Sequence, residues 1–192
     1  HWTWPGREGK VTPVFVYTNH PTAELFINGK SYGKQSKNNS SLKNRYRLMW
    51  MDAVYEPGEI KVVAYNKDGK AVAEKIVRTA GKPHHIELVS NRNELTADGK
   101  DLAYVTVKVV DKDGNLCPAD NRQINFSVKG TGKYRAAANG DPTNLEQFHL
   151  PKMHAFNGML TAILQAGETA GEIVFTAKAN GVKAGNIRIQ TK

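Results

Sequence analysis

Apolar and polar side chains alternate along most of this chain, in short runs separated by turn residues. In residues 22–28, Leu25 and Ile27 face one way and Glu24, Phe26 and Asn28 the other. In residues 45–50, Tyr46, Leu48 and Trp50 alternate with Arg45, Arg47 and Met49. A period of two residues is typical of strands with one buried face. No segment before residue 80 shows a 3.6-residue period, so the first half of the chain is predicted to be antiparallel β structure.

Turn signals divide the chain at regular intervals. Asn28-Gly29 and Asp68-Gly69 each join two runs with strand character, and such pairs are strong hairpin signals. Pro13 places the run at 11–17 at a sheet edge or a strand start. Further turns are expected at Asp98-Gly99, Asp113-Gly114 and Asn180-Gly181, between strand runs at 84–90, 102–111, 123–130, 159–165, 171–179 and 186–192. Short strands at this spacing predict an all-β chain of two tandem immunoglobulin-like antiparallel β-sandwich domains.

A break in the pattern at residues 78–83, RTAGKP, predicts a short linker. The expected domains are therefore residues 1–80 and 81–192, each large enough to bury a core.

The long segment 139–158 follows neither period and is bracketed by Asn139-Gly140 and Asn157-Gly158. A loop of this length in a compact domain is functional, packed on itself or misread. Its polar residues, Asp141, Glu146, His149 and His154, make it the first place to look for an active site. No second carboxylate can be paired with Glu146 from the sequence, so we expect a structural clasp over one end or edge of the second domain, packed through Phe148, Leu150, Met153 and Phe156.

No metal or cofactor site is expected. His149 and His154 lack zinc-ligand spacing. Residues 111–115, DKDGN, suggest a calcium loop, but the glycine falls at the fourth position and Arg122 stands where a glutamate is needed. A hairpin turn explains this segment better. The single cysteine, Cys117, excludes an internal disulfide and is expected to be a buried or idle thiol.

The net charge of +9, from 27 Lys+Arg and 18 Asp+Glu, raises the possibility of an anionic partner. The basic residues are dispersed, however, and the densest run, Lys34 to Arg47, is typical of a loop and an edge strand. We therefore expect no nucleic-acid partner. No apolar run reaches the roughly twenty residues of a membrane helix, so no membrane span is expected.

Aromatic residues are the remaining candidates for binding. Trp2 and Trp4, two apart in a segment expected to be extended, would project to one side. Together with His1 they are predicted to contact carbohydrate or, preferably, a missing neighbouring domain, whose removal would leave an exposed aromatic patch. Trp50, Tyr32 and Tyr55 are an alternative carbohydrate platform, although the strand pattern favours a core position for Trp50.

Several motifs resemble those of glycoside hydrolase family 2. HWTWPGREG at 1–9 and YTNHPTAELFINGKSYGKQ at 17–35 resemble the sandwich that follows the catalytic barrel in bacterial β-galactosidases and related enzymes. LTADGKDLAYVTVKVVDKDGNLCPAD at 95–120 and the segment 139–158 resemble the next, C-terminal sandwich of that family.

The resemblance implies a non-catalytic C-terminal accessory region. The family's two catalytic glutamates lie on a (β/α)₈ barrel, which takes roughly 250 residues, so this chain is expected to be inactive alone and to contain no catalytic residue. Its expected partners are an upstream barrel of the same polypeptide, the parent enzyme's carbohydrate substrate and possible oligomer contacts. The chain starts at His1 without a signal peptide, as if cut from something longer. The resemblance also implies a periplasmic, extracellular or cell-surface enzyme.

Two other functions remain open from the sequence. A carbohydrate-binding module would use exposed aromatic side chains, and a cell-surface adhesion module is suggested by tandem immunoglobulin-like domains alone.

Overall fold

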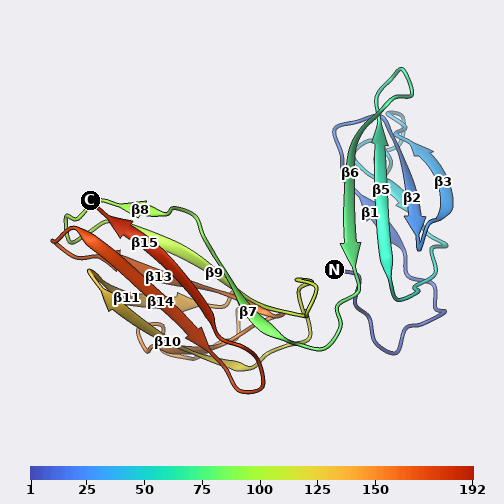
Figure 1. The fold of residues 1–192 in the computed structure, drawn as a ribbon. Coiled ribbons are helices and arrows are strands. Elements are labelled where there is room, and N and C mark those ends of the chain that lie inside the picture. The colour runs from blue at the N-terminus through green and yellow to red at the C-terminus, as the bar shows by residue number, and fades with distance from the viewer. The chain divides into compact units, whose positions relative to one another are not determined.

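The computed structural model describes all residues from His1 to Lys192 and contains fifteen strands, β1 to β15 (Figure 1). The predicted all-β class is confirmed, with one short parallel pairing, between β15 and β8, among antiparallel ladders. The chain divides into unit 1, His1–Thr79, and unit 2, Ala80–Lys192. No helix in it is long and apolar enough to span a bilayer.

Unit 1 is an uneven sandwich. A four-stranded sheet has the order β3-β2-β5-β6, and the opposing sheet contains only β1 and β4. Alternation along β2 buries Ala23, Leu25 and Ile27 in the core between the sheets, beside Leu48 and Trp50 of β4. The strand bounds are β1 Val14–Val16, β2 Thr22–Ile27, β3 Lys30–Ser36, β4 Leu48–Trp50, β5 Glu59–Tyr65 and β6 Ala71–Arg78.

The hairpin at Asn28-Gly29 is confirmed between β2 and β3. Both residues have positive φ, 48° and 80°, as a type I′ turn requires. The Asn28 side chain also accepts the Glu59 N–H at 2.8 Å and donates to the Pro57 carbonyl at 3.1 Å. This asparagine therefore fixes the hairpin and joins it to the start of β5.

Unit 2 is a sandwich of two larger sheets, β12-β10-β14-β15-β8 and β11-β13-β9-β7. Its core takes alternate residues of both, including Val105 and Val107 of β9 and Phe175 of β14. The strand bounds are β7 His85–Ser90, β8 Glu94–Leu95, β9 Leu102–Val110, β10 Gln123–Gly130, β11 Gly132–Ala138, β12 Lys152–His154, β13 Met159–Ala166, β14 Gly171–Lys178 and β15 Gly185–Thr191.

The alternation of apolar and polar residues did not predict three strands of unit 2. β8 has two residues, β12 lies inside the segment expected to be an irregular loop, and β11 has the sequence GKYRAAA. That sequence lacks β-branched residues, so its strand conformation depends on pairing with β13.

Candidate functional site

A groove of about 530 Å³ opens on the side of unit 1 where β1 lies opposite β5 and β6. It follows from the uneven sandwich, since the two-stranded sheet does not cover all of the four-stranded one. Ile60, Val62 and Val77 line the groove and also pack against the hydrophobic core. Part of the core of unit 1 is thus reachable from outside.

The rim of the groove carries exposed aromatic rings. Trp4 is 39% exposed, Phe15 45% and Tyr17 69%, and all three line the groove. The Arg47 guanidinium lies 5.4 Å from the centroid of the Phe15 ring, and Lys75 lines the groove from β6. The site therefore combines an apolar floor with an aromatic rim, two cations and the Glu74 carboxylate.

The structure brings His1, Trp2 and Trp4 to this groove, but the two tryptophans have different environments. Trp2 is buried: its indole Nε1–H donates to the Glu56 carbonyl at 3.0 Å, and its ring meets the Tyr55 ring edge-on at 5.0 Å. Trp4 stays half-exposed beside the His1 ring, with centroids 4.3 Å apart. The expectation that both tryptophans project outward together is therefore wrong for Trp2, which packs in the core.

The alternative platform of Trp50, Tyr32 and Tyr55 does not form. Trp50 and Tyr55 are each 1% exposed, and Tyr32 packs against the same core. The Trp50 Nε1–H donates to the Gly33 carbonyl at 3.0 Å, so this indole has a structural partner, as the strand pattern predicted.

The segment 139–158 contains a polar cleft of about 540 Å³, lined by Asp141, Glu146 and His154 among others. The Glu146 carboxylate accepts hydrogen bonds from the His154 backbone N–H at 3.1 Å and from its ring Nδ1 at 3.0 Å. Hydrogen bonds from the backbone and hydroxyl of Thr143 hold the pKa of Asp141 below its usual range. A glycosidase general acid needs a raised pKa, so Asp141 has the wrong environment for that role.

The segment is held to unit 2 by pairing of β12 with β10 and by a tyrosine that the sequence did not single out. The Tyr134 hydroxyl, on β11, donates to the carbonyls of Phe148 at 3.0 Å and Leu150 at 2.7 Å. Burial raises the pKa of Tyr134 to about 12. Met153 is fully buried, whereas Phe148 is 54% exposed, so the predicted packing is correct for Met153 and wrong for Phe148.

The predicted turn at residues 111–115 is confirmed. The Asp111 carboxylate is buried and accepts the N–H groups of Gly81 at 2.8 Å and of Asp113 and Asn115 at 2.9 Å. Burial alone would raise its pKa, but these hydrogen bonds, together with those from the Asn115 side chain, outweigh burial and lower the pKa to about 2. The carboxylate therefore holds these three backbone N–H groups in place.

Cys117 is buried, as expected. Burial first, and then the nearby Asp111 and Asp120 carboxylates, raise the pKa of its thiol to about 11. A thiol of this kind stays protonated at neutral pH and is a poor nucleophile.

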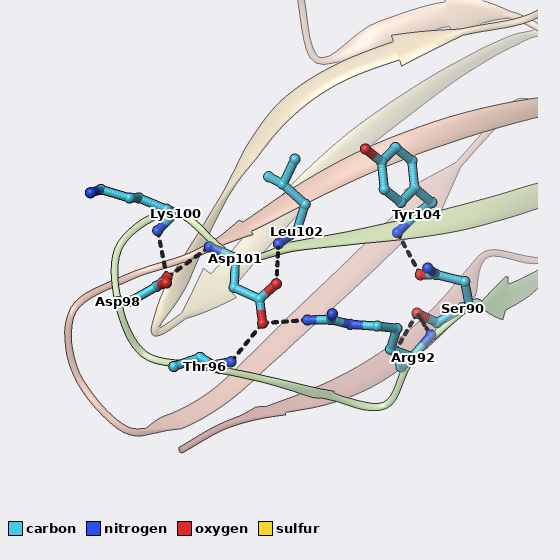
Figure 2. Close-up of polar contacts among 9 residues, drawn as sticks. Ser90, Arg92, Thr96, Asp98, Lys100, Asp101, Leu102 and Tyr104 are labelled. Atoms are coloured by element: carbon cyan, nitrogen blue, oxygen red, sulfur yellow. Dashed lines mark hydrogen bonds and ion pairs between the residues drawn. The ribbon is translucent and has the colours of Figure 1, made fainter.

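Figure 2 shows what the acidic residues of the segment 95–102 do. Asp101 accepts the N–H groups of Thr96 at 2.8 Å and Leu102 at 2.9 Å, and the Arg92 guanidinium donates to it as well. Asp98 Oδ1 accepts the N–H groups of Lys100 and Asp101, both at 2.8 Å. These hydrogen bonds lower the pKa of both carboxyls, and the two aspartates shape the predicted turn.

The comparisons with known proteins decide the family. A model described as glycoside hydrolase family 2 C-terminal domain 5 matches residues 86–188, and one described as a domain of unknown function, DUF4982, matches residues 9–73. The chain belongs to glycoside hydrolase family 2. The sequence motifs resemble a family 2 region of the β-galactosidase type, and the comparisons confirm the family.

Its relatives are much longer than the chain. It is 39% identical to "Beta-galactosidase BoGH2A" of Bacteroides ovatus over 100% of its own length and 22% of that protein. A family 2 member from Bacteroides cellulosilyticus superposes with a TM-score of 0.90 at 35% identity, covering 100% of this chain and 24% of the other. A β-glycosidase from Bacteroides vulgatus gives a TM-score of 0.91 at 31% identity, with 99% and 24% covered. The chain thus spans about a quarter of the length of these family 2 enzymes.

Proposed function

We propose that this family 2 chain is the non-catalytic C-terminal region of a β-galactosidase-type enzyme, and that unit 1 docks on the catalytic domain of the same polypeptide through the aromatic groove. The groove is the observation that carries the docking proposal, because its floor consists of core residues and its rim of exposed aromatic rings. Interface cores are enriched in aromatic residues and arginine and depleted of lysine and carboxylates, so Glu74 and Lys75 are expected at the edge of the docking interface and the aromatic rings at its centre.

The description of the matching family model supports the accessory role, since it names a C-terminal domain of family 2. The fold agrees with it. A (β/α)₈ barrel needs eight parallel strands with helices between them, whereas this chain has antiparallel sheets. The catalytic acid and nucleophile would then lie in the part of the enzyme that this chain does not include.

A carbohydrate-binding module is the second candidate, because half-exposed Trp4 beside His1 offers a ring on which a sugar can stack. The groove floor favours a protein partner over a sugar. Sugar hydroxyls need several polar side chains, and the floor formed by Ile60, Val62, Ala64 and Val77 has none.

Hydroxyl-radical footprinting tests the docking surface directly. In the separate 192-residue chain, Trp4, Phe15 and Tyr17 should be oxidised; in the complete enzyme, they should be protected several-fold. Tyr46 and Leu145, which are exposed and lie outside the groove, should label equally in both. Equal labelling of the groove residues would refute docking through this surface.

Activity and sugar titration test the other parts. The separate chain should not hydrolyse aryl-galactosides, and turnover abolished by Glu146→Gln would overturn the accessory role. Quenching of Trp4 fluorescence by galacto-oligosaccharides, lost in Trp4→Ala, would favour the carbohydrate-binding module.

Export to the periplasm or cell surface and contacts between subunits complete the proposal. Cell fractionation and size-exclusion chromatography of the complete enzyme test them.

A further inference from the structure

The outer faces of the two sheets of unit 2 differ in charge. On the sheet β11-β13-β9-β7, the centre of the face is neutral: cross-strand pairing places Ile163 beside Tyr104, and Thr161 beside Thr106. On the sheet β12-β10-β14-β15-β8, the corresponding face carries exposed lysines. We call this second surface the basic face and define it by Lys152 of β12, Asn125, Ser127 and Lys129 of β10, Thr176 and Lys178 of β14, and Asn186 and Arg188 of β15.

The strand register fixes where the positive charges of the basic face lie. Asn125 pairs with Lys152 on one side and with Lys178 on the other, so all three point to the same face. The two lysine Cα atoms are therefore about 10 Å apart, because neighbouring strands are about 4.8 Å apart. Lys129 lies further along β10, about 13 Å from Asn125 at 3.3 Å per residue.

These three lysines are not neutralised within the molecule. Lys129, Lys152 and Lys178 are exposed and take part in none of the ion pairs of the structure. The carboxylates on this sheet have other partners, since Glu172 pairs with Arg188 and Glu94 with Lys192 at the far edge. Three free cations on one face attract an anion, and their spacing requires a ligand with repeated charges to reach two or more of them.

The side chains between the lysines indicate the chemistry of that ligand. The Asn125, Ser127 and Asn186 side chains are exposed amides and a hydroxyl, which exchange hydrogen bonds with sugar hydroxyls. The face carries no Phe, Tyr or Trp ring, and its one aromatic side chain, His154 at the β12 edge, is hydrogen-bonded to Glu146. Its one large apolar residue, Val174, is half-buried. A flat sheet without protruding apolar side chains also lacks the means to insert into a bilayer.

We infer that the basic face binds an anionic polysaccharide, whose carboxylate or sulfate groups contact Lys129, Lys152 and Lys178 while its hydroxyls contact the intervening polar side chains. This interaction does not depend on the groove of unit 1 or on the proposed docking. It would hold the chain on a charged glycan without any stacking platform.

Affinity electrophoresis of the complete 192-residue chain tests the inference, with gels containing polygalacturonate, a sulfated galactan or a neutral galactan. The chain should be retarded by at least one anionic polymer and not by the neutral one. Raising NaCl from about 50 to about 150 mM should weaken binding about tenfold, as expected for three contacts with a log–log slope of about −0.7 each. The two anionic gels distinguish carboxylate from sulfate as the recognised group.

A triple variant, Lys129→Gln, Lys152→Gln and Lys178→Gln, should lose the retardation. The matched control is Lys100→Gln, Lys133→Gln and Lys183→Gln, which removes the same charge from exposed positions of unit 2 off the basic face and should bind as wild type. Equal loss in both variants would mean that only net charge matters and would overturn the inference, as would no binding of wild type or stronger retardation by single-stranded DNA.

Discussion

The hydroxyl of Tyr55 accepts a hydrogen bond from the backbone N–H of Trp4 at 3.1 Å. The same tyrosine ring packs edge-on against Trp2, so one buried side chain fixes both the inward and the outward tryptophan. This arrangement makes the groove rim a pre-formed surface. A pre-formed surface loses less conformational entropy when a partner binds.

Replacing Tyr55 with Phe tests this role. The change keeps the packing but leaves the Trp4 N–H without its acceptor, so the free energy of unfolding should fall by about 1 kcal/mol. Thermal denaturation measures the loss, and acrylamide quenching should show Trp4 more accessible than in wild type. Tyr46→Phe, at a site 65% exposed, is the control and should change neither.

Removing the Tyr134 hydroxyl should loosen the segment 139–158. Tyr134→Phe leaves the Phe148 carbonyl without this donor, and we expect a stability loss of about 1–2 kcal/mol. Phe148 is already half exposed, so chymotrypsin should cut after it several-fold faster in the variant. Tyr104→Phe, on the outer face of the same sheet and 45% exposed, should leave the cleavage rate unchanged. Unchanged cleavage in Tyr134→Phe would show that other contacts hold the segment.

Three truncations along the same segment should give graded effects. Met153→Ala removes a fully buried side chain and should cost about 2–5 kcal/mol. Phe156→Ala, at a half-buried position, should lower the melting temperature less, and Leu145→Ala, at a site 96% exposed, should not lower it. Equal melting temperatures for all three variants and wild type would mean that the segment does not clasp the domain.

Acid should destabilise unit 2 through Asp111. Its folded pKa of about 2 lies below the unfolded value of about 3.9, so the carboxylate contributes stability above pH 4. That contribution, roughly 2–3 kcal/mol, should be lost as the pH falls from 4 towards 2. Denaturant titrations at several pH values should show a weaker pH dependence in Asp111→Asn, which is less stable than wild type at pH 7. Asp113→Asn, with its side chain 61% exposed, should retain the wild-type profile.

Features fixed by local sequence were predictable here. The turns at Asn28-Gly29 and Asp113-Gly114 depend on a few adjacent residues, and both form where the sequence placed them. The alternation of β2 and β4 likewise identified the core positions, because one face of each strand is buried.

Features fixed by residues distant in the sequence were not predictable from it. Trp2 is buried because its indole N–H donates to the Glu56 carbonyl and its ring packs against Tyr55. Both partners are more than fifty residues away in the sequence. The role of Tyr134 depends on the carbonyls of Phe148 and Leu150, which lie 14 and 16 residues further along the chain. The strand β11 likewise depends on its pairing with β13. The groove itself follows from the number of strands in each sheet of unit 1, which alternation along a single strand does not encode.

The unequal sheets of unit 1 have a consequence for measurement. Because Ile60, Val62 and Val77 belong both to the groove and to the core, a molecule that fills the groove binds the folded form and has nothing equivalent to bind in the unfolded chain. A ligand at a hundred times its dissociation constant then adds about 2.7 kcal/mol to the folding free energy. The melting temperature of unit 1 is therefore a direct readout of groove occupancy, and a thermal-shift screen can find what fills it without any assay of catalysis.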